Sequence, residues 1–180
     1  MKTILIIAAL FTATLIYGQG ATTGKLTIHG TSNLHDWETV ATEVAVQGSF
    51  SIESGILKSI DKLNVRIPVK KIKSEKGKTM DNKTYDALLA DKNPNITFVA
   101  TKVQITGADI TATGTMNVAG KSKPAILKAK WRQLPGSEVE ITGSYALKMT
   151  DFGISPPTAL LGTMKTGDGI TVKFTVKTKA

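Results

Sequence analysis

The chain has 180 residues, with 23 Lys and Arg, 14 Asp and Glu, and no Cys. The missing cysteine excludes disulfide bonds and a lipid-modified cysteine behind an export signal. The formal net charge of +9 favours transient contact with an anionic membrane surface. Since the lysines are spread along the chain without interleaved aromatic residues, we expect no nucleic-acid binding.

Residues 1–18 have the layout of a secretory signal peptide, because Lys2 is followed by an apolar and hydroxyl-bearing stretch over 4–17. This stretch is too short for a membrane span with flanking anchors. We expect cleavage near Gly18 or Gly20 and assign 19–180 to one domain. The domain is then periplasmic or secreted.

Alternating apolar residues predict most of the secondary structure. From Val40 to Ile52 every second side chain belongs to one face, which predicts a single strand over 39–53, about 40 Å long. The same period of two predicts strands over 24–30, 56–69, 95–106, 109–118, 124–132, 138–150 and 169–178. The opposite faces carry Thr, Lys, Glu and Ser, so a sheet with one dry face must curl on itself. We expect an all-β, elongated eight-stranded antiparallel barrel.

Interruptions of the pattern add three features to this barrel. The apolar phase slips within 56–69 and near 98–101, which indicates bulges. A helix is predicted before Pro94, with Asp81 as its cap and Met80 and Tyr85 at the staple positions. A second helical turn is predicted over 157–162. Both helical segments would flank a barrel mouth.

Small residues on the predicted inner face leave two interpretations open. Gly48, Ala112, Gly114, Ala129 and Gly143 alternate with large side chains, and they either leave a lumen for one slim ligand or offset large residues in a packed core. In the first case the candidate ligand contacts are the apolar residues at inward positions and in the helical segments: Phe50, Leu88, Leu89, Phe98, Gly114, Met116, Trp131, Gly143, Tyr145, Met149, Phe152, Leu160, Leu161 and Met164.

Three stretches carry a family likeness: 86–98 with Pro-x-Ile-x-Phe, 113–124 with Gly-x-x-Lys-Pro, and 149–154 with Asp-Phe-Gly-Ile. Their order and spacing resemble the YceI-like family. The resemblance implies a lipocalin-like barrel, exported to the periplasm, that holds a polyisoprenoid or a similar long lipid without catalysis. It implies no cofactor other than that bound lipid. The family's opening Asp-x-x-His-Ser strand is replaced here by Gly30-Thr31-Ser32-Asn33-Leu34-His35.

The cluster His35-Asp36-Trp37 is the candidate head-group site, with a structural corner as its alternative role. A hydrolase would use His35 as a general base for Ser32, but no nucleophile-elbow pattern supports it, and we expect no catalytic residues. His29, His35 and Asp36 lack a defined ligand spacing, so we expect no metal site.

Two functions from different classes follow from these patterns. The first is an exported carrier for a long hydrophobic molecule, namely a polyisoprenoid, an isoprenoid quinone or a fatty-acid derivative. The second is an exported structural or interaction module with a filled barrel and a basic docking loop over 70–78, where Lys70, Lys71, Lys73, Lys76 and Lys78 cluster.

Overall fold

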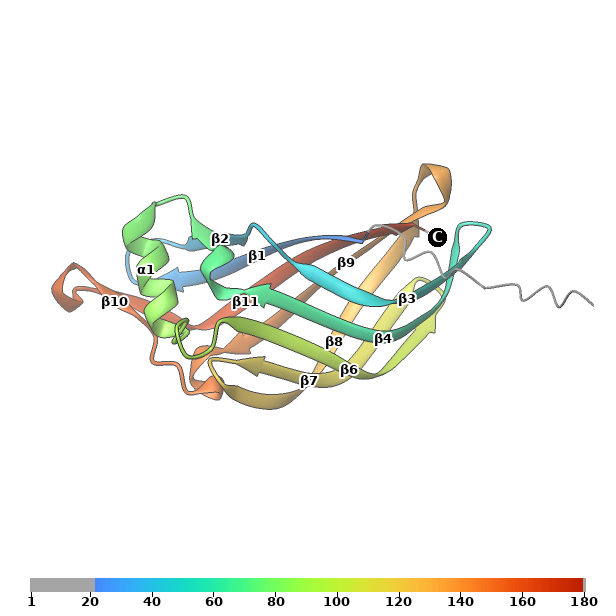
Figure 1. Cartoon of the computed structure of the whole chain (residues 1–180). Helices are drawn as coiled ribbons and strands as arrows, with labels where there is room; N and C mark the ends of the chain where they lie inside the picture. Colours follow the sequence, from blue (N-terminus) through green and yellow to red (C-terminus); the bar gives the residue numbers. More distant parts are fainter. Residues whose placement is uncertain (1–21, 180) are drawn as a thin grey trace, which may run out of the picture.

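The computed structural model describes residues 22–179, so the predicted signal peptide lies outside the described residues. One antiparallel sheet curls into a half-barrel in the order β3-β4-β6-β7-β8-β9-β11-β1-β2-β5 (Figure 1). The strands are β1 (Thr23–Ser32), β2 (Trp37–Ala41), β3 (Ala45–Glu53), β4 (Ile56–Pro68), β5 (Ile72–Ser74), β6 (Asn95–Thr106), β7 (Asp109–Val118), β8 (Lys121–Gln133), β9 (Glu138–Lys148), β10 (Thr158–Ala159) and β11 (Met164–Lys179). The helix α1 (Lys78–Ala87) and four 3-10 turns complete the described part: η1 (Val69–Lys71), η2 (Pro135–Ser137), η3 (Met149–Phe152) and η4 (Leu160–Gly162).

The consecutive hairpins from β6 to β9 follow the sequence pattern closely. β6 and β7 begin and end where the alternation predicts. The expected bulge falls between Ala100 and Lys102, where the β6–β7 register shifts. Register shifts also occur where β4 pairs with β3, and Lys62 there has a φ of 53°. The prediction of bulges in both regions is confirmed.

The prediction of one long strand over 39–53 is wrong, because the strand is interrupted at residues 42–44. In β2 the inward residues are Thr39 and Ala41, both buried, whereas the sequence pattern had placed Val40 inside. The backbone N–H and hydroxyl of Thr42 both donate to the Lys71 carbonyl, which holds the chain at the break. The apolar phase therefore changes between β2 and β3, and two short strands replace one.

The predicted number of eight strands is also wrong. The interruption divides one strand into two, and the three-residue β5 was not predicted. Of the helical turn predicted over 157–162, only η4 is helical, and the two-residue β10 takes the place of its first half. β3 and β5 are the edges of the sheet. β3 lies against β1 through side chains, since a Cβ on Gly24 would stand 3.4 Å from the Val46 side chain. Side-chain packing thus brings β3 and β1 together, although these two strands do not pair with each other.

Helix α1 begins earlier than predicted, and Asp81 is not its cap. The N-cap position is Gly77, which makes no side-chain capping bond, and Asp81 is buried in the first turn. The Asp81 carboxylate accepts a hydrogen bond from the Ser74 backbone N–H at 2.7 Å and pairs with Lys73 Nζ at 3.2 Å. The Tyr85 hydroxyl donates to the Lys70 carbonyl at 2.9 Å. These contacts hold the helix on β5 and η1.

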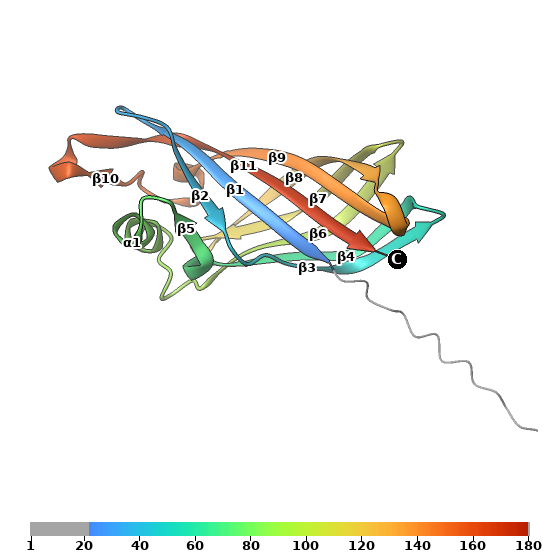
Figure 2. The ribbon, with the colours of Figure 1, turned by 90° about the horizontal axis from the view of Figure 1, so that it is seen from above.

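The two ends of the half-barrel differ in what they contain. Figures 1 and 2 place α1, β10 and the β1–β2 turn at one end, called here the mouth, and the β3–β4 turn at the other, called the far end. The far end is packed by the buried residues Leu57, Ile60, Ile110, Val139 and Ile141. No helix among residues 22–179 has the length and apolarity needed to cross a bilayer.

Candidate ligand cavity

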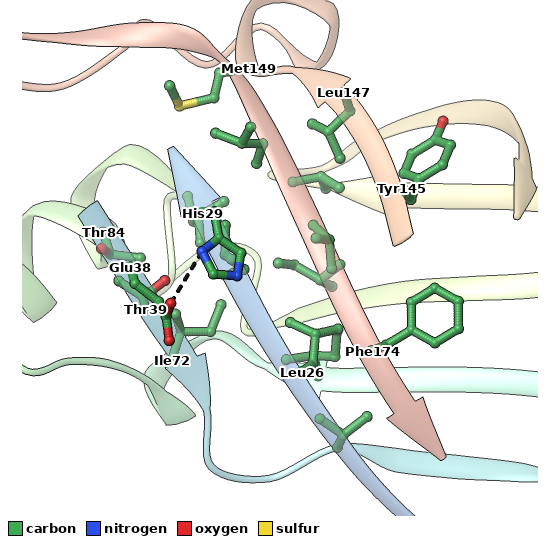
Figure 3. Close-up of a pocket in the computed structure, with 18 of the residues that line it drawn as sticks. Leu26, His29, Glu38, Thr39, Ile72, Thr84, Tyr145, Leu147, Met149 and Phe174 are labelled. Atoms are coloured by element: carbon green, nitrogen blue, oxygen red, sulfur yellow. Dashed lines mark ion pairs between the residues drawn. The ribbon is translucent and has the colours of Figure 1, made fainter. Parts of the chain in front are cut away.

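A cavity of about 910 Å³ occupies the inside of the half-barrel. Its wall is formed by inward side chains of the strands and by one face of α1, and Figure 3 shows Leu26, Tyr145, Leu147 and Phe174 projecting toward it. Ligand pockets typically measure about 300–1,000 Å³, so this space is large enough for a bulky molecule. The inner face is therefore hollow over much of its length, which answers the question of a packed or an open lumen.

Polarity changes along this cavity. Toward the far end the wall is apolar and includes Phe50, Ile60, Leu127, Ala129, Ile141 and Val176. At the mouth the lining includes His35, Asp36, Ser74, Glu75, Lys76, Lys83 and Thr84. A molecule with one polar end and a long apolar body would match this gradient, because the polar end stays near water while the body loses its contact with it.

Aromatic rings lie close to two glycines of the sheet. A Cβ on Gly143 would lie 2.4 Å from the Phe174 ring on the neighbouring strand, and one on Gly30 would lie 2.1 Å from the Trp37 ring. Each glycine thus provides space for a ring that also lines the cavity. At these two sites the space left by the small residue is therefore occupied by a ring.

Gly114 has a different role. A Cβ there would stand 2.2 Å from the Val99 carbonyl oxygen and 2.7 Å from the Ala100 Cα, both backbone atoms next to the β6 bulge. Neither Gly114 nor Gly143 is part of the cavity lining. The structure places both glycines in the packing of the barrel wall, and their role as ligand contacts stays a prediction.

The other predicted contact residues divide into two sets. Those on the cavity wall are Phe50, Leu88, Phe98, Met116, Tyr145, Met149 and Met164. Those away from it are Leu89, Trp131, Phe152 and Leu161, while the side chain of Leu160 lies outside the described part.

A different structural feature keeps each of these residues away from the cavity. Phe152 is the last residue of η3 and is buried in a cluster with Val118. Trp131 packs against the far-end cluster, and its indole N–H donates to the Gly107 carbonyl at 2.9 Å. Leu89 and Leu161 adopt positive φ values in turns and point into solvent. An apolar side chain in a predicted inward position thus need not reach the lumen.

The predicted head-group cluster lies at the mouth, and hydrogen bonds within the β1–β2 turn already use some of its polar groups. The Trp37 indole N–H donates to the Thr31 carbonyl at 3.0 Å, so that donor is already used. The Ser32 hydroxyl accepts from the backbone N–H of His35 and donates to its carbonyl at 2.7 Å, which closes the turn. The side chains of His35 and Asp36 are exposed and line the cavity entrance.

The hydrolase and metal interpretations gain no geometric support. The Ser32 hydroxyl donates to the backbone of His35 and not to its imidazole. His29 pairs with Glu38, at 3.1 Å between Nδ1 and Oε2, rather than with His35 and Asp36 (Figure 3). Among residues 22–179 no group of three His, Asp or Glu side chains could hold a metal ion.

Three of the five lysines in the basic loop over 70–78 form ion pairs with neighbouring carboxylates. Lys70 pairs with Asp91 at 2.7 Å, and Lys71 and Lys73 pair with Glu43 and Asp81. The hydrogen bond between Lys70 and Asp91 raises the pKa of the lysine and lowers that of the aspartate. These three lysines act within the fold, which weakens the interpretation of the loop as a docking patch.

Sequence reasoning did not select several wall residues. Leu26 and Ile28 on β1, Val172 and Phe174 on β11, and Thr39 on β2 all line the cavity. The alternation in 24–30 and 169–178 already indicated which of these side chains face inward. The missing information was that β1 and β11 lie side by side with Phe174 paired to Leu26.

An antiparallel half-barrel around a largely apolar cavity defines the class of this protein, and comparison gives its family. The YceI-like domain model matches residues 34–178, so the chain belongs to the YceI-like family and the likeness in the sequence is confirmed. UPF0312 proteins of Pseudomonas aeruginosa are 33% identical over 107 residues, 53% of this chain and 53% of the relative. The chain thus spans about half the length of the curated relatives it matches.

Solved structures share the fold at low sequence identity. BcnA of Burkholderia cenocepacia has a TM-score of 0.71 at 16% identity, covering 87% of this chain and 96% of that chain. The YCEI protein of Campylobacter jejuni has a TM-score of 0.62 at 23% identity, covering 79% and 84%. A polyisoprenoid binding domain from Saccharophagus degradans has a TM-score of 0.63 at 11% identity, covering 87% and 94%.

Proposed function

We propose that this protein is an exported, non-catalytic carrier that binds a long hydrophobic molecule in its cavity. A polyisoprenoid, an isoprenoid quinone and a fatty-acid derivative are the ligand classes that fit this proposal. The observation that carries it is the cavity of about 910 Å³ with an apolar far end and a polar mouth. The similar polyisoprenoid binding domain from Saccharophagus degradans supports the first of these ligand classes, a polyisoprenoid.

In this proposal the hydrophobic effect supplies the affinity. Buried apolar area contributes about 25 cal/mol per Å², and a prenyl or acyl chain has few groups that could form hydrogen bonds. The chain would lie against Phe50, Phe98 and Tyr145, with its end among the far-end residues. Shape and length would then set specificity more than individual polar contacts.

The polar end of the ligand would remain at the mouth, near His35 and Asp36. Lys76 and Lys83 line the same region and suit a phosphate or carboxylate, whereas Glu75 and Asp36 oppose one. The Lys83 ammonium already donates to the Thr158 carbonyl at 2.9 Å, so Lys76 is the freer cation of the two. We expect the head group to be only loosely selected.

The proposal is tested by purifying the protein without detergent from the exported fraction of its native host. Native mass spectrometry followed by organic extraction should reveal one prenyl or acyl species in stoichiometric amount. Protein that carries no lipid and also fails to bind added polyisoprenols, quinones and fatty acids would contradict the carrier function. Recovery of the protein only in the cytoplasmic fraction, with its first 18 residues attached, would contradict the export.

A further inference from the structure

The rim of the mouth exposes two leucines, of which Leu34 borders the cavity entrance and Leu161 lies away from the cavity wall. Leu34 in the β1–β2 turn is 61% exposed and Leu161 in η4 is 106% exposed, the two highest values among the large apolar side chains described. Leu34 and its neighbour His35 line the entrance, and so does Met164, three residues after Leu161. Figure 2 places both turns at the same end of the molecule.

Asn33 holds these two turns together. Its backbone N–H donates to the Lys165 carbonyl at 3.1 Å, and its amide donates to the Thr163 carbonyl at 2.9 Å. The Lys165 N–H in turn donates to the Asn33 side-chain oxygen at 2.8 Å. Three hydrogen bonds therefore join the β1–β2 turn to the β10–β11 hairpin, so the leucines are presented by one connected element.

The backbone of η4 keeps Leu161 pointing outward. Leu161 has a φ of 55° and Gly162 a φ of 89°. The left-handed region is unfavourable for leucine, and a leucine held there in full contact with water gains no burial in return. An exposed apolar residue in a strained turn suggests a surface that is covered in use.

We propose that Leu34 and Leu161 form a tip that inserts into the surface of a lipid bilayer and places the cavity mouth against it. This inference rests on the proposed function, because a water-insoluble ligand must enter from a lipid phase. Continuity with the cavity entrance favours a bilayer as the occupant. Lys165, exposed between the two turns, can extend its ammonium to the head groups while its stem stays apolar.

Two leucines provide only weak anchoring, which suits a carrier that must leave the membrane again. Because the contact is apolar, it should persist at high salt, where adsorption through scattered lysines is screened. The salt response thus separates tip insertion from a general attraction of the positively charged chain to anionic lipid.

The test compares co-sedimentation with vesicles of phosphatidylethanolamine and phosphatidylglycerol at high salt. We expect Leu34→Gln/Leu161→Gln to bind at least about tenfold more weakly than the wild type, since each leucine contributes buried apolar area. The matched control is Ile56→Gln/Ile126→Gln, which removes two apolar side chains that are 46% and 55% exposed elsewhere on the barrel. The control should bind like the wild type.

A second measurement separates this inference from the carrier function. Binding of a water-dispersed fluorescent prenyl probe should be equal in the wild type and in the single variant Leu161→Gln, because Leu161 lies away from the cavity wall, while transfer of the probe from vesicles should be slower in Leu161→Gln than in the wild type. Equal vesicle binding by the wild type and by Leu34→Gln/Leu161→Gln, or no vesicle binding by the wild type, would overturn the tip even if the probe binds. Failure of every protein to bind the probe, with leucine-dependent vesicle binding intact, would reject the carrier function and leave the tip.

Discussion

The far end and the mouth of the half-barrel are built from the same sheet but are held in different ways. At the far end the wall is made of long strands, and Leu57, Val139 and Ile141 are buried among other apolar side chains. At the mouth the strands give way to α1, β5 and β10, and polar links such as Asp81 to Ser74 fix their positions. The difference shows that regular alternation builds the shell, whereas individual side-chain contacts determine its opening.

The largest effect should follow from filling the apolar part of the cavity. Ala129 lines the wall near the far end, and Ala129→Phe would place a ring in the space proposed for the ligand chain. We expect affinity for a fluorescent prenyl or fatty-acid probe to fall at least about 100-fold, a loss of about 2.7 kcal/mol in binding free energy.

The matched control for this change is Ala146→Phe, at an exposed position of β9 on the opposite face of the sheet. It adds the same ring but leaves the cavity unchanged, so probe affinity should equal that of the wild type. If Ala129→Phe folds normally and binds the probe as tightly as the control does, the ligand does not occupy this part of the cavity.

A second change tests whether the shell depends on close backbone approach. Gly114→Ala forces a Cβ against the Val99 carbonyl and the Ala100 Cα, and no side-chain movement can relieve that contact. We expect the free energy of unfolding in urea to fall by about 2–3 kcal/mol, as for other overpacked sites. Gly169→Ala is the control, because nothing lies within 4 Å of its added Cβ. Similar stability of the two variants would mean that the wall at β6–β7 adapts more easily than its geometry indicates.

The same contrast explains what could be predicted from the sequence. The extents of β6 and β7, the bulges and the cavity-facing positions of Phe50 and Tyr145 follow from local alternation. β5 and β10 have too few residues to show a period. The roles of Gly114 and Gly143 depend on which backbone or ring lies across the neighbouring strand, and that is a property of register. Sequence reasoning was therefore most successful for the shell and least successful for the mouth.

At the mouth, removal of the Asp81 carboxylate should loosen the contact between α1 and β5. Asp81→Ala leaves the Ser74 N–H without its acceptor, and we expect the free energy of unfolding to fall by about 1–2 kcal/mol. Asp81→Asn keeps an acceptor oxygen and should recover part of the loss. Hydrogen exchange of the Ser74 amide is the direct measurement. Unchanged protection of this amide in Asp81→Ala would show that the helix is held mainly by Tyr85.

The smallest effect concerns a hydrogen-bonded aspartate that joins β11 to η3. The Thr150 hydroxyl and N–H donate to the two Asp168 carboxylate oxygens at 2.7 and 2.9 Å, and these bonds lower the pKa of Asp168. A lowered pKa in the folded state contributes stability above the ordinary aspartate pKa of about 3.9, and this contribution disappears as the pH falls through the folded-state pKa.

Thr150→Val removes the hydroxyl donor, so we expect a small decrease in Tm at neutral pH that shrinks as the pH falls below about 4. Arg132→Gln provides the counterpart near the far end, because Arg132 lowers the pKa of Glu140 by the same kind of hydrogen bond. Both variants should approach the wild-type Tm in acid. Hydrogen exchange should separate them at neutral pH, with faster exchange around η3 in the first and along the paired ends of β8 and β9 in the second. Faster exchange throughout the sheet in both variants would mean that the mouth and the far end unfold as one unit. The two ends would then differ in their residues but not in their local stability.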